Sequence, residues 1–316
     1  MKEKSKKTGF TIIELLTVMS IIVILISLLL PSLAMVRRFA KEVKQRAQFR
    51  SISAALEMFH KDWGDYPPSA GTTDPIDQPW LDENNQWYCG AMMLCEAMVG
   101  QDLLGFHPES HFTSDSSQWF GGQPSGRWTD GLYPVQLDPQ TDPLDRENMD
   151  VRRGPYLDAE TSEAYKLQDL YLNIGSFNAG AGNDSDDRVL CDMYSRVTHR
   201  ATGRKVGMPI LYYRANPSGI RHDPNDFAPP DPLKPNIYNY LDNDYLVMLG
   251  IPTNQALVHP LHQASVGGEG QRFYEVTLNE EIDTMERPYN PESYILISAG
   301  YDGLYGTEDD IYNFGK

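Results

Sequence analysis

Cysteine is scarce in this sequence, and an excess of positive charge is missing. The three cysteines, Cys89, Cys95 and Cys191, are too few for a disulfide framework and lack the paired Cys-x-x-Cys spacing of a zinc site. A bridge between Cys95 and Cys191 and buried free thiols both remain open. The formal net charge is −17. Such a charge repels phosphate backbones, so we expect no nucleic acid among the partners.

The common catalytic signatures are also missing. We find no nucleophile elbow, phosphate-binding loop or dinucleotide fingerprint. The pair His259 and His262 flanks Pro260 and has no glutamate placed as in His-Glu-x-x-His, so a surface turn is favoured over a zinc site. The sequence therefore predicts no catalytic residues and no enzyme.

Charge is distributed unevenly along the chain. Residues 1–50 contain ten Lys and Arg and three Asp and Glu, a net +7, which leaves 17 − 41 = −24 for residues 51–316. A basic start beside an apolar run suits an anionic membrane surface. The remaining residues, with hydrophobics at 41% of the whole chain, are too apolar for global disorder.

The most informative segment is an apolar run near the N-terminus. No charged residue occurs from Leu15 to Val36, which is 22 positions. At about 1.5 Å per residue this run covers the roughly 30 Å hydrocarbon core of a bilayer. It is longer than the apolar core of a secretory signal and is not followed by a small-x-small cleavage site. We therefore expect a membrane-spanning helix that stays in the product.

A carboxylate and a glycine mark the start of this run. Glu14 directly precedes it and lies just inside the wider apolar segment that begins at Phe10, where a charged side chain costs on the order of 2.5–3.5 kcal/mol, so it needs a partner. A cut between Gly9 and Phe10 would create an α-amino group four residues before Glu14. Two charges that are each costly in lipid become acceptable when they pair.

The string GFTIIELL, residues 9–16, resembles the prepilin signature shared by type IV pilins and type II secretion pseudopilins. The resemblance implies that a membrane prepilin peptidase cuts between Gly9 and Phe10 and methylates Phe10. It also implies that Glu14 pairs with the N-terminal amine of a neighbouring subunit in a filament. Pro31 matches a family position at which the helix kinks or locally melts.

The charges flanking the run disagree with the family on orientation. Four lysines precede it and six basic residues, from Arg37 to Arg50, follow it, and this bias by itself places the body in the cytoplasm. The resemblance implies the opposite: a single-pass protein of the bacterial inner membrane with its head in the periplasm or outside the cell, and a place in the pseudopilus after assembly. We expect the family orientation.

The remaining pattern predicts a leader (1–9), a long helix (10–64) and a head (65–316). The membrane half of the helix is about 10–36, and the amphipathic half, 37–64, has apolar residues at three-to-four spacing. These apolar residues are Phe39, Ala40, Val43, Ala47, Ile52, Leu56, Phe59 and Trp63. Helices are predicted at 87–104 and 159–172, and strands at 189–197, 209–215, 245–249, 273–278 and 294–298. We therefore predict an α+β fold with an antiparallel sheet and long ordered loops.

The C-terminal tail concentrates oxygen ligands. Asp302, Glu308, Asp309 and Asp310 lie within nine residues, among glycines that allow tight turns, and Ca²⁺ selects such hard oxygens. The tail resembles the last loop of the major type II pseudopilin, its G subunit, in which calcium is bound. The resemblance implies Asp302 and Asp310 as ligands, with Asp309 and then Ser298 or main-chain carbonyls. A solvated acidic turn is the alternative, and residues 183–187 are a weaker candidate.

The sequence as a whole predicts a structural subunit of a type II secretion pseudopilus or type IV pilus-like filament that supports protein secretion. Expected partners are copies of itself, other pseudopilins, the prepilin peptidase, the inner-membrane assembly platform and the bilayer. A minor pilin with a ligand-binding head and a membrane-anchored extracytoplasmic enzyme remain alternatives. The first of these is suggested by Trp80, Trp87, Trp119 and Trp128, which otherwise belong to the core. The large insert, 65–290, leaves major and minor subunit both open.

Overall fold

A computed structural model describes most of the chain. The described residues are 11–70, 88–112, 132–133, 139–140, 142–158, 162–178, 188–223, 235–262, 270–282 and 286–315. The chain forms two compact units, Met1–Val43 and Lys44–Lys316. The second unit contains the head together with the C-terminal part of the first helix.

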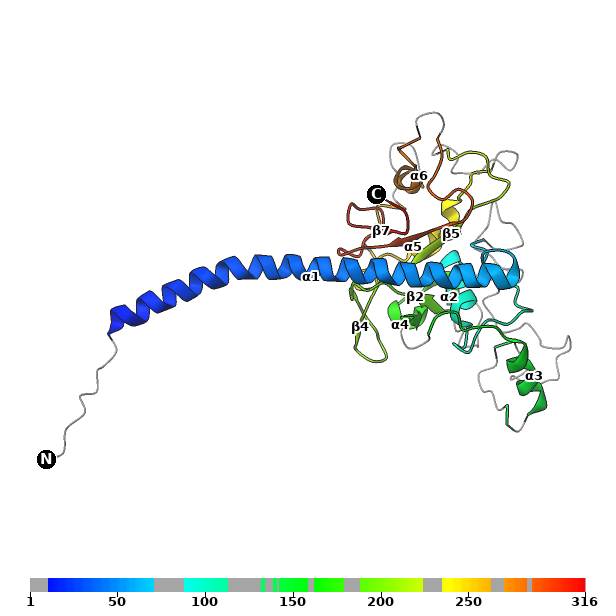
Figure 1. Ribbon diagram of the computed structural model, residues 1–316, viewed down its shortest axis with the longest axis horizontal. Coiled ribbons are helices and arrows are strands. Elements are labelled where there is room, and N and C mark those ends of the chain that lie inside the picture. The colour runs from blue at the N-terminus through cyan, green and yellow to red at the C-terminus, as the bar shows by residue number, and fades with distance from the viewer. Residues whose placement is uncertain are drawn as a thin grey trace. The chain divides into compact units, whose positions relative to one another are not determined.

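Helix α1 (Ile12–Trp63) is 52 residues long (Figure 1). In the first unit its apolar side chains are exposed on all sides, which is typical of a helix that lies in lipid. Among the described residues, α1 is the one helix long and apolar enough to cross a membrane. The helix is continuous through Pro31, so the local melting implied by the family resemblance is absent. Proline removes a single backbone donor here, and the hydrogen bonds on either side persist.

In the second unit, one face of α1 is buried. The buried positions are Gln45, Gln48, Phe49, Ile52, Ala55, Leu56 and Phe59. The predicted stripe is therefore confirmed from Ile52 onward but wrong at its earlier positions. Phe39 and Val43 are 64% and 50% exposed, and Ala40 and Ala47 are exposed as well. Apolar spacing alone does not reveal where a partner surface begins, and here the packed face begins at Gln45.

Two buried glutamines fix α1 to the main chain beyond strand β2 (Arg188–Leu190). Gln48 Nε2 donates to the Cys191 carbonyl at 2.8 Å, and Gln45 Oε1 accepts from the Met193 amide at 2.8 Å. Buried backbone groups need such partners. These two polar residues therefore belong to the packed face, although an apolar pattern could not indicate them.

The central sheet of the head is antiparallel, with the order β5-β6-β7. Its strands are β5 (Leu211–Arg214), β6 (Tyr294–Ser298) and β7 (Ile311–Tyr312). Leu211 pairs with Ile297, and Ser298 pairs with Ile311. Two smaller antiparallel pairs are β1 (Ala164–Lys166) with β2, and β3 (Val197–Thr198) with β4 (Lys205–Val206). The long helix and the antiparallel head confirm the predicted α+β fold class.

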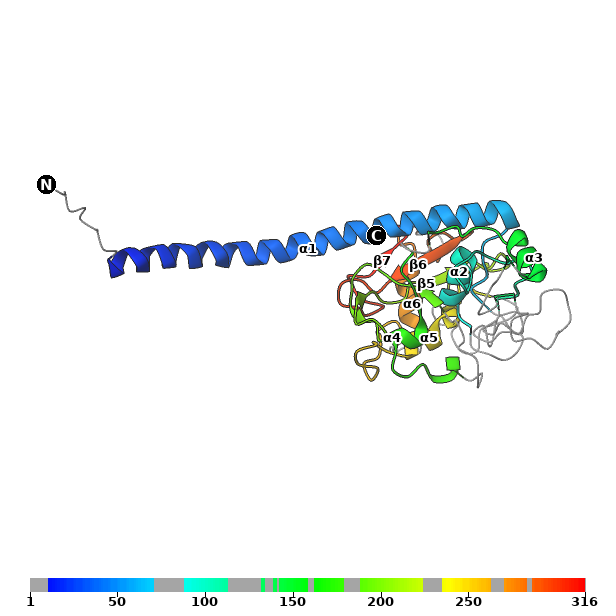
Figure 2. The same ribbon diagram turned by 90° about the horizontal axis from the view of Figure 1, so that it is seen from below.

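The sheet separates two hydrophobic cores, because successive side chains of a strand point to opposite faces. On β6, Tyr294 and Leu296 belong to the core that contains Leu56 and Phe59 of α1. Ile295 and Ile297 belong to the other core, which includes residues of the short helices. Figure 2 shows the second part of α1 running along the head above β5 and β6.

The remaining helices are short. They are α2 (Gly90–Val99), α3 (Pro143–Val151), α4 (Leu167–Leu170), α5 (Asp244–Met248), α6 (Gln271–Thr277) and the 3-10 turns Gly175–Asn178 and Tyr240–Asp242. The prediction of a helix at 87–104 is confirmed in shortened form, and the strands at 209–215 and 294–298 are confirmed. The strands predicted at 245–249 and 273–278 are wrong, because both segments are helical. The helix predicted at 159–172 is also wrong in part, since β1 precedes one helical turn.

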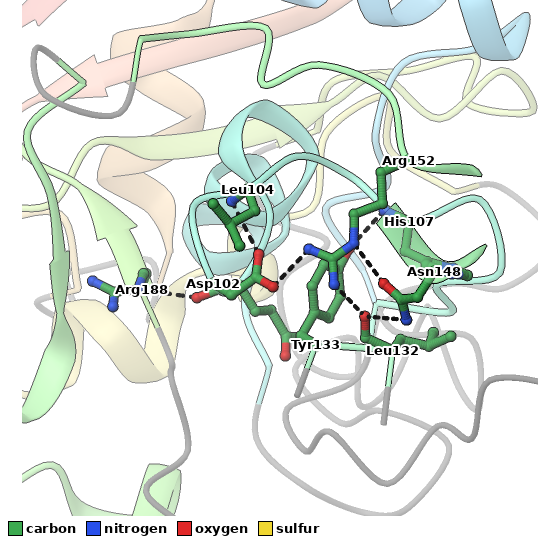
Figure 3. Close-up of polar contacts among 9 residues, drawn as sticks. Asp102, Leu104, His107, Leu132, Tyr133, Asn148, Arg152 and Arg188 are labelled. Atoms are coloured by element: carbon green, nitrogen blue, oxygen red, sulfur yellow. Dashed lines mark hydrogen bonds and ion pairs between the residues drawn. The ribbon is translucent and has the colours of Figure 1, made fainter. Parts of the chain in front are cut away.

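A buried ion pair joins the turn after α2 to the end of α3 (Figure 3). Arg152 lies 2.6 Å from Asp102 and also donates to Asn148 and to the Leu132 carbonyl. Its guanidinium carbon lies 5.1 Å from the centre of the Tyr133 ring. A buried guanidinium requires this degree of pairing. All three cysteines are buried and free, so the Cys95–Cys191 bridge is absent.

Replacement of Leu56 tests the contact between α1 and the sheet. Leu56 is fully buried, so Leu56→Ala should lower the free energy of unfolding of the head by about 2–5 kcal/mol. Met58 lies on the same helix, two positions after Leu56, and is 53% exposed. Met58→Ala should therefore change the free energy of unfolding by less than about 0.5 kcal/mol. Urea unfolding of the full chain in detergent, followed by tyrosine and tryptophan fluorescence, measures both. Equal effects would contradict the assigned buried face.

Candidate functional site

The N-terminal end of α1 is closed by a capping box. Glu14 Oε2 accepts from the Thr11 amide at 2.9 Å and from the Thr11 hydroxyl at 2.7 Å. In return the Glu14 amide donates to Thr11 Oγ1 at 3.3 Å. This reciprocal arrangement satisfies two of the amides that every helix start leaves without partners. The Thr-x-x-Glu spacing that produces it is visible in the sequence, whereas the family resemblance implies a different role for Glu14, in filament assembly.

The capping box leaves one oxygen of Glu14 available. Oε1 accepts no hydrogen bond from any residue between 11 and 70 or elsewhere in the described ranges. The carboxylate lies at the N-terminal end of α1, beside the first-turn amides. Glu14 can therefore cap its own helix with one oxygen and receive an ammonium group with the other. The expected processing residues, Gly9 and Phe10, lie outside the described residues.

The C-terminal tail folds into a tight loop between β6 and β7. Gly300 has φ +62°, and a Cβ at this position would lie 2.0 Å from the Asp309 carbonyl oxygen, so only glycine fits. Asp309 Oδ2 accepts from the Asp302 amide at 2.9 Å, and Asp302 Oδ1 accepts from the Leu304 amide at 2.7 Å. The loop therefore brings together Asp302 and Asp309, which are seven residues apart in the sequence.

Asp310 occupies a more enclosed position. Its Oδ2 accepts from the Gly306 amide at 2.7 Å and from the Tyr312 hydroxyl at 3.1 Å. Its Oδ1 is buried and has no hydrogen-bond partner among the described residues. Ser298, in contrast, donates its hydroxyl proton to Asp192 at 2.9 Å. In the structure Ser298 is therefore hydrogen-bonded to Asp192, which lies 106 positions away in the sequence. The sequence of the C-terminal tail could not predict this contact.

The three aspartates differ in acidity. Burial raises the pKa of Asp310 well above its ordinary value. Burial, with the nearby charge of Asp309, also raises the pKa of Asp302. For Asp309 burial acts in the same direction, but hydrogen bonds from Thr307 and from the Asp302 amide outweigh it and lower the pKa. The three carboxyl groups in this loop therefore share few hydrogen-bond donors. A hard cation bound there would supply the missing positive charge.

The donor set fits calcium in part. Asp302 and Asp309 supply carboxylate oxygens, and Asp310 supplies an oxygen without a hydrogen bond. Within the part of the chain that the structure describes, however, no three His, Cys, Asp or Glu side chains already converge on one point. Main-chain carbonyls of the loop would have to complete the shell of six to eight oxygens that Ca²⁺ takes.

The two histidines of the pair differ in burial: His259 lies in the interior of the head and His262 is partly exposed. His259 is fully buried, its ring lies against Tyr305, and its Nδ1 accepts from the Tyr305 amide at 3.2 Å. His262 contacts Asp244 at 2.6 Å. The predicted turn is present, because the His262 amide donates to the His259 carbonyl at 3.1 Å. Its predicted surface location is wrong for His259, which supports the loop that carries Tyr305. Residues 183–187 and the four tryptophans of the insert lie outside the described residues.

Comparison with known families addresses the N-terminus. A family model described as the prokaryotic N-terminal methylation motif matches residues 4–30. The chain carries this methylation motif. No curated protein and no solved structure matches the chain. The match spans the predicted cut, the capping box and the apolar start of α1, so the methylation motif and the exposed apolar helix identify the same functional segment.

Proposed function

We propose that this chain is a prepilin-type precursor whose product assembles through α1 into a type IV pilus-like or type II secretion filament. The observation that carries the proposal is the methylation motif over 4–30, which overlaps the first part of α1, where the apolar residues are exposed on every side. Such a surface is stable in lipid or against identical helices, but not in water. The role is structural, in support of protein secretion, and requires no catalytic residue.

The prepilin peptidase would act first. Hydrolysis between Gly9 and Phe10 removes the basic leader, and methylation of the new amine at Phe10 completes the product. The mature chain then begins one residue before the capping box, with its amino group at the start of the helix. The inner-membrane assembly platform and other pseudopilins are the further partners that this route implies.

Glu14 would then set the position of each subunit. Its Oε2 is engaged by Thr11, so Oε1 is the atom that we assign to the amine of a neighbouring Phe10. Within the bilayer each of these charges alone is costly, and their pairing removes much of that cost. The head lies in the periplasm or beyond it in this proposal, in a single-pass protein of the inner membrane.

A head that also binds a ligand is the second candidate, favoured by Asp242, a buried residue that lines a hollow in the head and has one carboxylate oxygen without a hydrogen-bond partner among the described residues.

We also propose that the C-terminal loop binds Ca²⁺. Asp302 and Asp309 would be the side-chain ligands, with Asp310 Oδ1 and loop carbonyls as further oxygens. Bound calcium would offset much of the negative charge that these carboxyl groups concentrate and would hold the ends of the loop together. Ser298 is engaged with Asp192 and is left out of the ligand set.

Processing is tested by coexpression of the chain with a prepilin peptidase. The membrane fraction should contain a product whose mass and N-terminal sequence correspond to a methylated Phe10. Gly9→Leu should leave the chain starting at Met1, because the bulky side chain replaces the residue at the cut. Recovery of an intact wild-type chain, or of a cut beyond the apolar run, would remove the proposal.

Assembly is tested at Glu14 in cells that contain the peptidase and the assembly platform. Glu14→Leu should still insert into the membrane and be processed, but its content in sheared filaments should fall at least tenfold because the amine loses its partner. Thr11→Ala is the matched control, since it breaks the capping box and retains the carboxylate, at a cost of about 0.5–2 kcal/mol in helix stability. Similar losses in both variants would assign Glu14 to capping alone.

Calcium binding is tested by the melting temperature of the full chain in detergent. Calcium should raise the melting temperature of the wild type, because a ligand that binds only the folded state stabilises it. Asp302→Asn with Asp309→Asn should abolish the rise, whereas Glu308→Gln, in the same loop, should retain it. An unchanged calcium response in the double variant would refute the site.

A further inference from the structure

A hollow of about 560 Å³ lies beside the end of strand β5, within the head. Its apolar lining includes Pro68, Pro217, Pro235 and Ile237, and its polar lining includes Ser69 and Asp242. A second hollow, of about 410 Å³, shares Arg214 to Pro217 and Ile237 with it, so the two adjoin. Neither takes part in the proposed filament contacts of α1, so a ligand here would add a function to the head.

Asp242 is the exceptional residue of this lining. It is 3% exposed, and its Oδ2 accepts from the Ser69 hydroxyl at 2.5 Å. Its Oδ1 has no hydrogen-bond partner among the described residues. Burial raises the pKa of Asp242 to about 7, so the carboxyl is partly ionised at neutral pH. A buried carboxylate with one unpaired oxygen is costly unless something donates to it.

The sheet edge holds Ser69 and Asp242 in place. Strand β5 is an outer strand, and its free edge is satisfied by side chains in place of another strand. The Arg214 amide donates to Ser69 Oγ at 2.9 Å, and Asn243 Nδ2 donates to the Tyr212 carbonyl at 2.7 Å. Since Ser69 accepts from Arg214, its single proton is directed to Asp242 Oδ2. Only Oδ1 is left for a further donor.

The charges around the first hollow do not balance. Among its described lining residues the charged side chains are Asp242 and Arg214. Arg214 is already paired with Asp65. Asp242 therefore remains without a compensating cation, and a positively charged ligand fits the hollow better than an anion.

The geometry of the carboxylate limits the kind of cation. A guanidinium group binds through two parallel hydrogen bonds and prefers both oxygens of a carboxylate. Here Ser69 occupies Oδ2, so a compact ammonium group that needs one acceptor fits better. The prolines and Ile237 supply apolar walls against which the methylene stem of such a ligand can pack.

We propose that this hollow binds a primary ammonium group on an aliphatic stem, with Asp242 Oδ1 as its acceptor. Two sources share this chemistry: a lysine side chain of a partner protein and a free alkylamine. Binding of either gives the head a specific recognition site that is independent of filament assembly.

The test uses the full chain in nanodiscs and equilibrium dialysis of radiolabelled probes, with empty nanodiscs as the blank. The probes are Nα-acetyl-lysine methylamide, its neutral Nε-acetylated counterpart and 1,5-diaminopentane. The charged lysine probe should bind at least tenfold more tightly than the neutral one. Tighter binding of the lysine probe than of the diamine assigns the site to a protein partner, and the reverse order assigns it to a free amine. Equal binding of the charged and neutral probes would overturn the proposal.

Two variants locate the binding. Asp242→Asn retains the shape and an acceptor for Ser69 but removes the charge, so it should weaken binding of the lysine probe at least tenfold. Glu292→Gln removes a carboxylate from the adjoining hollow and should change the affinity less than twofold. An unchanged affinity in Asp242→Asn, or equal losses in both variants, would refute the assignment to Asp242. The comparison of charged and neutral probes on the wild type decides the question even if Asp242→Asn does not fold.

Discussion

The packing of α1 against one face of the central sheet is the contact on which the architecture of the head depends. Phe49, Ile52 and Leu56 of the helix share a core with Tyr212 and Leu296 of the sheet. The opposite face of the same sheet supports a second core, which contains α6 and the short helix α5. A single sheet thus carries two hydrophobic layers, and the loss of either would expose a strand surface that is buried on both sides.

The two parts of α1 differ in which side chains they expose. Its first part exposes apolar residues on every side, as lipid or neighbouring helices require, and its second part buries one face only. Buried Gln45 and Gln48 continue that face by binding main-chain groups near the end of β2. A filament subunit of the proposed kind needs this division, because one helix then links the membrane segment to the folded head without a break.

Short segments were the least predictable part of the fold. Residues 273–278 are rich in aromatic and β-branched residues, which favours a strand. The chain forms α6 instead, because in a helix both Phe273 and Tyr274 can pack in the core. Likewise 245–249 forms α5, although its apolar content resembles that of a strand. In runs of five or six residues the tertiary contacts outweigh local preference. The prediction of strand 294–298 is confirmed, since an apolar run from Tyr294 to Ile297 is bounded by turns.

The features of the N-terminal segment are readable from the amino-acid sequence: the apolar run, the position of Glu14 and the methylation motif over 4–30. These features are local, because a membrane helix forms all its backbone hydrogen bonds within its own segment. Other features emerge from the folded head alone: Ser298 pairs with Asp192, His259 is buried, and Ser69 meets Asp242 across 173 positions. Such pairs depend on which segments the sheet brings together, and no local pattern of charge or hydrophobicity records that arrangement.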